Sequence, residues 1–156
     1  MLNIVALSKE TPMDTDIFYE AGYRGSKGFS QWEVPTANAT GFTAAADDHM
    51  ERGIDLNEQL ITNKPATFFF RMKGDAMLGA GIRPGDILIV DRSLKPTNGK
   101  IIVAIIEGEL LVRRLQKTPD AVMLLAENRK LSPIRLHSFN EKDLLWGVVT
   151  YTISPV

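Results

Sequence analysis

The sequence predicts a mainly β domain built from coiled, barrel-like sheets, and two observations predict this fold class. First, strand-like runs of six to nine residues, rich in apolar side chains, recur from residue 67 onward, and turn residues such as Pro, Gly and Asn separate them. Second, residues 87–90 (ILIV) and 101–106 (IIVAII) are apolar at every position. Runs without alternation are typical of strands that are buried on both faces. Short strands at this spacing therefore indicate a closed or curled sheet.

The expected elements begin with a short helix and continue as strands. Residues 55–61 have the apolar spacing of one helix face. Pro84 and Gly85 introduce one strand, and Glu107 and Gly108 form the turn of an expected hairpin. The predicted strands cover residues 67–72, 86–91, 100–106, 109–115, 121–126 and 145–153.

Residues 1–53 have a different composition, rich in Gly, Ala, Thr and acidic residues, and Pro12 and Pro35 interrupt any long helix. Because the segment also carries aromatic residues, we interpret it as an extended arm that packs on an apolar surface. That surface belongs either to its own domain or to a partner. A partly disordered tail is the alternative. The sequence thus predicts an arm over residues 1–53 and a β domain over residues 54–156.

The composition makes several kinds of function unlikely candidates. With 18 Lys and Arg against 19 Asp and Glu, the net charge is −1, so tight direct binding to duplex DNA is not expected. The absence of cysteine excludes disulfides and thiolate chemistry, and His49 and His137 have no spaced ligand partners, so neither a metal nor a cofactor is expected. The longest apolar run, residues 101–106, is far shorter than the ~20 residues that span a bilayer. We therefore expect a cytoplasmic protein without a membrane anchor.

Residue types alone show no GxSxG, Walker-type or HExxH motif. Several short motifs nevertheless follow one another in a specific order: residues 54–57 (IDLN), 74–77 (GDAM), 81–93 (GIRPGDILIVDRS), 98–104 (NGKIIVA), 108–115 (GELLVRRL), 132–134 (SPI) and 146–150 (WGVVT). Over roughly residues 41–153 they resemble the LexA-type self-cleaving serine peptidases. Within that family the chain is most similar to the UmuD/MucA mutagenesis proteins.

The resemblance implies a serine–lysine dyad, and this chain departs from it at both positions. In the family, a serine within the GDSM-type motif attacks the peptide carbonyl, and a neutral lysine with a lowered pKa takes the proton. The corresponding positions here are Ala76 for the nucleophile and Arg113 for the general base. Alanine has no nucleophile, and a guanidinium stays protonated. Asp75, Ala76 and Met77 correspond to the oxyanion-hole region, although Met77 can equally be a core residue.

The cleavage site departs from the family pattern as well. The family cuts an Ala-Gly or Cys-Gly bond, and the aligned bond here is Thr40–Gly41. Threonine is β-branched and should enter a small pocket less readily. An Ala-Gly pair exists at Ala21 and Gly22, but it lies upstream of the family's cut. Three departures together favour a natural pseudo-peptidase over a variant engineered to be inactive, which remains the other explanation.

The resemblance further implies a UmuD-like accessory subunit of an error-prone, translesion DNA polymerase in the SOS response. Such a protein acts as a homodimer and binds the Y-family polymerase subunit and the RecA–single-stranded DNA filament. Two alternatives remain open. One is a Ser/Lys autopeptidase of the same family, present here as a disabled variant. The other is a non-catalytic interaction module that antagonises a cleavable paralogue.

Side-chain directions complete these expectations. Arg113 and Arg114 are consecutive on a strand, so they should point to opposite faces. Because a buried unpaired guanidinium is costly, we expect Arg113 to pair with a nearby carboxylate such as Asp75 or to fix the arm. Arg114 should be solvated or face a partner. Residues 68–70 (FFF) are expected in the core or a dimer interface, and Trp146 in the core.

Overall fold

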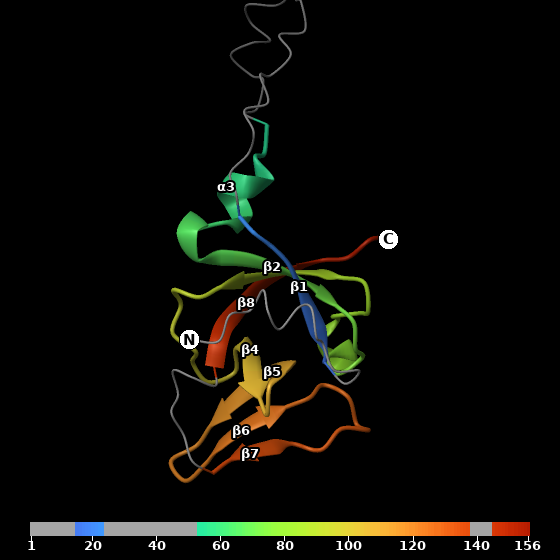
Figure 1. Ribbon diagram of the computed structural model, residues 1–156, viewed down its shortest axis with the longest axis vertical. Helices are drawn as coiled ribbons and strands as arrows, with labels where there is room; N and C mark the ends of the chain where they lie inside the picture. Colours follow the sequence, from blue (N-terminus) through green and yellow to red (C-terminus); the bar gives the residue numbers. More distant parts are fainter. Residues whose placement is uncertain (1–14, 24–52, 138–144) are drawn as a thin grey trace, which may run out of the picture.

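The structure is a computed structural model that describes residues 15–23, 53–137 and 145–156. Its strands form one antiparallel sheet in the order β1-β2-β3-β8-β4-β5-β6-β7 (Figure 1). They are β1 (Ile17–Gly22), β2 (Thr67–Met72), β3 (Ile87–Asp91), β4 (Ile101–Ile106), β5 (Glu109–Lys117), β6 (Val122–Leu125), β7 (Ile134–Leu136) and β8 (Leu145–Ile153). The helical elements are α3 (Leu56–Leu60) and the 3₁₀ turns η1 (Lys64–Ala66) and η2 (Leu78–Ala80). The predicted mainly β class is confirmed.

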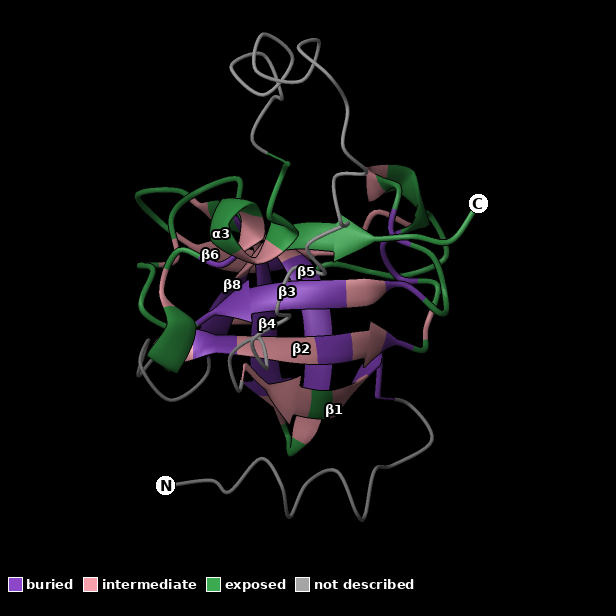
Figure 2. Ribbon diagram, turned by 90° about the horizontal axis from the view of Figure 1, so that it is seen from above, coloured by how far each residue is buried: buried purple, intermediate pink, exposed green. Residues whose placement is uncertain are grey.

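The sheet curls because one strand belongs to both of its halves. The C-terminal part of β8 pairs with β3, from Val148 to Ile153, and its N-terminal part pairs with β4, from Leu145 to Val148. Register shifts in both pairings mark where β8 bends between its neighbours. Seen from above, β1, β2 and β3 cross over β4 and β5 at a steep angle (Figure 2). The result is the coiled, half-closed barrel that the strand pattern predicted.

Local sequence accounts for the ends of these elements. Asp55 caps α3, because its carboxylate accepts a hydrogen bond from the Asn57 backbone N–H at 2.9 Å. Glu107 and Gly108 both adopt positive φ, 52° and 81°, which is the geometry of a two-residue hairpin turn between β4 and β5. The predicted runs at residues 67–72 and 145–153 match β2 and β8 at both ends. The other predicted strands end within two residues of the observed ones.

The core lies on both faces of the central strands. Alternate residues of β4 enter two different apolar clusters: Val103 and Ile105 pack in one, and Ile102 and Ala104 in the other. All four are buried. This arrangement explains why residues 101–106 show no polar alternation, and it confirms the prediction of a strand buried on both faces.

The expected aromatic core is present in the first of these clusters. Phe70 is fully buried, and Trp146 is 7% exposed. The rings of Phe68 and Phe70 each meet the Trp146 ring edge-on, at a centroid distance of 5.2 Å. Phe69 points the other way, is half-buried and packs near Tyr23. The apolar run 68–70 therefore contributes mainly to the core of the chain itself.

Strand β1 was not predicted, since its residues belong to the segment that we interpreted as an arm. It pairs with β2 from Ile17↔Met72 to Gly22↔Phe68, with an irregularity in the register after Tyr19. Ile17 is fully buried. Residues 17–22 thus pack on the chain's own domain, one of the two surfaces that the sequence left open. Residues 24–52 lie outside the described residues, so a boundary at residue 53 stays a prediction.

Candidate functional site

Ala76 and Arg113, the two positions that correspond to the dyad, lie on segments held close to each other by the fold. Ala76 follows β2 and is 1% exposed, with its methyl group in the first core cluster. Its carbonyl accepts a hydrogen bond from the Glu127 backbone N–H at 2.9 Å. Arg113 lies in the middle of β5 and is 6% exposed. Neither side chain can act as the nucleophile or the base of a peptidase.

The Arg113 guanidinium is paired with a carboxylate of the arm. Its Nη1 donates to Asp16 Oδ2 and to the Val112 carbonyl, the latter at 2.8 Å. The side chains of Arg113 and Asp16 are 7% and 10% exposed. The expectation that Arg113 fixes the arm is therefore confirmed, whereas Asp75 as its partner was wrong. Asp16 immediately precedes β1, and its backbone N–H bonds the Leu110 carbonyl of β5. This contact places Asp16, and not Asp75, beside Arg113.

Asp16 is also anchored through its own backbone. Its N–H donates to the Leu110 carbonyl at 3.1 Å, and its carbonyl accepts from the N–H groups of Lys73 and Gly74, at 2.7 and 3.0 Å. The carboxylate accepts a further bond from the Val112 N–H at 3.0 Å. A Cβ at Gly74 would lie 3.0 Å from Asp16 Oδ1, so glycine permits this close approach. Asp16 therefore links β5 to the loop that leads to Ala76.

The electrostatics of this pair are dominated by burial. Burial raises the pKa of the Asp16 carboxyl above its ordinary value, Arg113 and the Val112 N–H oppose this rise, and Asp75 adds to it. Arg113 Nε and Thr15 Oγ1 are buried without a hydrogen-bond partner among the described residues. The ion pair is thus a desolvated contact, in which the attraction of Arg113 and the hydrogen bonds to Asp16 offset only part of the cost of burying the carboxylate.

A cavity of about 490 Å³ opens beside the pair. Its lining comprises Thr15, Asp16, Lys73, Gly74, Asp75, Glu109, Leu111, Arg113, Leu131 and Ile134. Asp75 is the neighbour of Ala76, so the cavity lies where the segments of both dyad positions meet. The described residues of its wall combine two basic side chains, Lys73 and Arg113, with three carboxylates and include no serine. Such a wall can hold a polypeptide segment, but it lacks the groups for Ser/Lys catalysis.

The remaining residues of the expected site are placed as follows. Met77 is fully buried in the first cluster, which accords with core packing, and an oxyanion role for this region stays a prediction. The Asp75 carbonyl accepts from Asn128 Nδ2 at 3.0 Å, so the loop is fixed from the side of β6. Thr40 and Gly41, the aligned cleavage bond, lie outside the described residues.

Arg114 points away from Arg113, as the alternation of a strand requires. It is nevertheless paired within the chain, because its Nε donates to Glu127 Oε1 at 2.5 Å and its Nη1 to the Gly99 carbonyl at 2.8 Å. Its side chain is 35% exposed, so it is partly solvated as expected, but the pairing with Glu127 was not foreseen. Glu127 also bonds the Ala76 carbonyl through its backbone, so Arg114 supports the loop that carries Ala76.

Sequence reasoning did not identify Asp16. The need for a carboxylate beside Arg113 was clear, but three acidic residues, Asp14, Asp16 and Glu20, lie in this part of the arm. Only the pairing of β1 with β2 brings Asp16 to Arg113. On the same strand Glu20 pairs with the exposed Arg71 at 2.6 Å. Strand register, which the sequence does not specify here, decides between them.

Two further features concern the described ranges alone. In residues 15–23, 53–137 and 145–156, no cluster of three or more His, Cys, Asp or Glu residues is placed to hold a metal ion. Within the same ranges, no helix has the length and the apolar character needed to cross a membrane.

Comparison with known proteins gives consistent matches over most of the chain. Residues 34–150 match the family described as Peptidase S24-like. Protein ImpA of Salmonella typhimurium is 40% identical over 113 residues, which are 72% of this chain and 76% of ImpA. Protein MucA of Salmonella typhimurium is 34% identical over 115 residues, 74% of this chain and 78% of MucA. The LexA repressor of Leptospira biflexa is 42% identical over 97 residues, but these are only 48% of the repressor.

Proposed function

The chain belongs to the Peptidase S24-like family, and we propose that within it the chain is a UmuD-like accessory subunit of an error-prone DNA polymerase in SOS mutagenesis. The lengths of the matches support this choice. Similarity to ImpA and MucA extends over about three quarters of both partners, whereas it covers about half of the LexA repressor. The accessory role, and not an operator-binding one, is therefore the function that the match favours.

We further propose that the chain is a pseudo-peptidase, and the observation that carries this proposal is the buried Asp16–Arg113 pair. An arginine at the base position cannot accept a proton, and here its charge is neutralised by the chain's own arm. Ala76 supplies no nucleophile. Regulation would then depend on the position of the arm or on partner binding rather than on cleavage.

The pair also bears on the two alternatives. An experimenter who disables a peptidase needs to replace only the nucleophile. Here the base position is changed as well, and its cation has a matching carboxylate held by both backbone and side-chain hydrogen bonds. This arrangement favours a natural pseudo-peptidase over a disabled variant. The antagonist of a cleavable paralogue remains the second candidate, because it needs the same loss of catalysis.

The accessory role is tested by primer extension past an abasic site with the Y-family polymerase of the same source and a RecA–single-stranded DNA filament. We expect the full-length chain to increase bypass, because the proposal requires the uncleaved chain itself to bind the polymerase, and reactions without RecA filament serve as the control. If bypass is unchanged and the chain does not co-elute with the polymerase, the accessory role is wrong. Suppression of the bypass that a cleavable paralogue supports would instead favour the antagonist.

The proposal includes a homodimer, and β8 offers a surface for it. Beyond Val148, the edge of β8 that faces β4 has no strand partner among the described residues. Tyr151 and Ile153 on this part of the strand are 46% and 44% exposed. An unpaired edge with exposed apolar side chains is a template for pairing with a second copy.

The variant Tyr151→Glu/Ile153→Glu should therefore be a monomer, because like charges would meet across the paired edges. Light scattering should give twice the chain mass of 17.3 kDa for the wild type and a single chain mass for the variant. Leu78→Glu is the matched control, since Leu78 is 47% exposed and lies outside all strands. A monomeric wild type, or a dimer unaffected by the β8 changes, would contradict this interface.

A further inference from the structure

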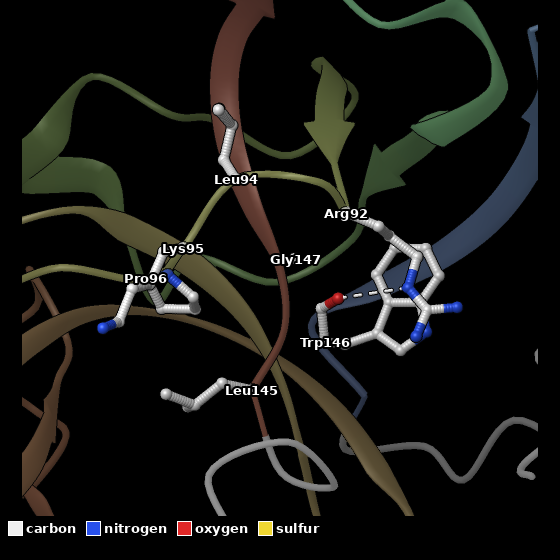
Figure 3. A pocket seen from close by; sticks show the side chains of 7 residues that line it. All are labelled: Arg92, Leu94, Lys95, Pro96, Leu145, Trp146 and Gly147. Carbon is white, nitrogen blue, oxygen red and sulfur yellow. Dashed lines mark hydrogen bonds between the residues drawn. The ribbon is translucent and has the colours of Figure 1, made fainter.

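A second pocket, of about 350 Å³, lies between the loop after β3 and the start of β8 (Figure 3). Its lining consists of Arg92, Leu94, Lys95, Pro96, Leu145, Trp146 and Gly147, and it shares none of them with the cavity beside Arg113. We propose that this pocket binds an acidic peptide segment of a partner protein, which inserts one apolar side chain between Arg92 and Lys95. This interaction does not depend on the accessory role or on cleavage.

The cation at one side of the pocket is held in place before any ligand arrives. The Arg92 guanidinium lies over the Trp146 ring, 4.5 Å from its centroid, and its Nε donates to the Trp146 carbonyl at 3.3 Å (Figure 3). At Gly147 a Cβ would lie 2.7 Å from Val90 Cγ1 and 3.6 Å from Arg92 Cγ. Glycine at this position therefore lets β8 pass close to Val90, the residue of β3 that lies two positions before Arg92. A preorganised cation loses less entropy when it binds an anion.

The charges of the pocket favour a negatively charged ligand. Among the described residues that line it, the charged ones are Arg92 and Lys95, and both are positive. The whole chain, by contrast, has a net charge of −1, so this positive character is local. Complementary charge selects the partner and increases the rate of association.

The apolar part of the pocket favours one inserted side chain. Leu145, Trp146 and Pro96 supply apolar wall, and Leu94 is 45% exposed at the rim. A volume of about 350 Å³ is at the lower end of the range for ligand pockets. It suits a leucine or phenylalanine side chain of a peptide, flanked by carboxylates that reach the two cations.

A peptide fits these observations better than a nucleic acid does. Bases need an open aromatic face to stack on, but Trp146 is 7% exposed, with Arg92 over its ring and Phe68 and Phe70 against it. Two cations also provide few contacts for a phosphate backbone, whose binding depends on many.

The test follows the Trp146 indole N–H signal by NMR during titration of the full chain, with Trp32→Phe used to assign it. The probe is the peptide acetyl-DDLFDD-amide, and the controls are acetyl-KKLFKK-amide and acetyl-DDGGDD-amide.

We expect a saturable shift of the Trp146 signal with the first peptide alone, and added salt should weaken the binding of this peptide. Arg92→Glu/Lys95→Glu should weaken binding at least about tenfold, and Lys95→Glu, which leaves the Arg92–Trp146 contact intact, about threefold. The charge-matched control Arg83→Glu/Lys130→Glu should bind as the wild type does.

Each other outcome would overturn the proposal. Equal binding of the basic peptide would remove the charge argument, and equal binding of the peptide without leucine and phenylalanine would remove the apolar anchor. Saturation by a dodecamer of thymidylate without peptide binding would make the site a nucleic-acid site. Peptide binding that appears only after residues 138–144, which directly precede Leu145, are replaced by a Gly/Ser linker would show that the chain's own segment fills the pocket.

Discussion

The variant Ala76→Ser/Arg113→Lys/Thr40→Ala is expected to cut its own chain before Gly41, while the wild type stays whole. Each change reverses one departure from the family pattern. Serine supplies the nucleophile, lysine can lose its proton, and alanine is small enough for the family's cleavage pocket. Because loss of the nucleophile from such a unit slows the reaction on the order of 10⁶-fold, the restored and unrestored chains should differ by orders of magnitude.

Asp16 determines the pH at which this cleavage should begin. A lysine at position 113 would lie beside the carboxylate that now binds Arg113, and this anion would favour the protonated lysine. The restored variant should therefore cleave only toward pH ~10, near the ordinary lysine pKa of ~10.4. Adding Asp16→Asn should shift the onset to lower pH, because the anion is removed and the lysine pKa falls.

Intact mass recorded against time between pH ~7 and ~10.5 measures both effects. The matched control keeps Ala76 and carries only Arg113→Lys and Thr40→Ala. A fragment that begins at Gly41 in this control would show that Ala76 is not at the nucleophile position. If the variant with all four changes stayed whole at every pH, the assignment of both dyad positions would be wrong.

The second large effect concerns stability, and it distinguishes the charge of Asp16 from its hydrogen bonds. Asp16→Ala should lower the free energy of unfolding by about 2–4 kcal/mol, because the buried donors of Arg113 and Val112 lose their acceptor. Asp16→Asn should lower it by less than about 1.5 kcal/mol, since the amide oxygen still accepts. Urea unfolding at neutral pH measures both changes. Glu20→Ala, in the adjoining strand β1, is the control and should have no measurable effect, because its pair with Arg71 is exposed.

The pH dependence of the same variants gives the sign of the charge contribution. Burial raises the pKa of Asp16 above 3.8, so the folded chain holds this proton more tightly than the unfolded chain does. The contribution of Asp16 is then fully present below pH 3.8 and is lost as the pH rises through its folded pKa. The wild type should therefore gain stability relative to Asp16→Asn as the pH falls toward 3.8. A difference that shrinks on acidification would show that the ion pair itself stabilises the fold.

Much of the β domain could be predicted because its signals are local. Strands β2 and β8 are rich in apolar residues, and the hairpin at Glu107 and Gly108 has its own turn chemistry. The double burial of β4 followed from the absence of polar residues in it. Strand β1 was missed because its sequence is short, contains Ala and Gly, and lies in a segment whose composition resembles an arm. Its place in the sheet depends on distant β2, which local pattern does not reveal.

The candidate site was predictable in part. The motifs placed Ala76 and Arg113, and the cost of a buried guanidinium required a carboxylate near Arg113. The identity of that carboxylate depends on the register between β1 and β2. This register brings Asp16 to Arg113, which lies 97 residues away in the chain. The ion pair of Arg114 was missed for a similar reason, because its partner Glu127 is brought near only by the pairing of β5 with β6. Pairs of this kind are properties of the sheet rather than of any single segment.

The contacts of residues 16–22 with the β domain give the arm a structural role, beyond that of a segment to be cut off. Ile17 is buried in the core, and Asp16 is bonded to β5 and to the loop before Ala76. Removal of the arm would expose apolar surface and leave Arg113 unpaired, which is unfavourable on both counts. Cleavage between Thr40 and Gly41 would cut the chain between the arm residues that make these contacts and the β domain. The pseudo-peptidase proposal and the stability prediction for Asp16 therefore depend on the same contacts.

The claim that the chain does not cleave itself is tested most directly by intact mass. The purified wild-type chain is incubated at pH ~10, where a family lysine would be deprotonated and an arginine would not, with and without RecA–single-stranded DNA filament. We expect only the full-length mass of 17.3 kDa under every condition. A fragment that begins at Gly41 or Gly22 would contradict it and would require another serine, with a base such as Lys73 or Lys95, to carry out the chemistry.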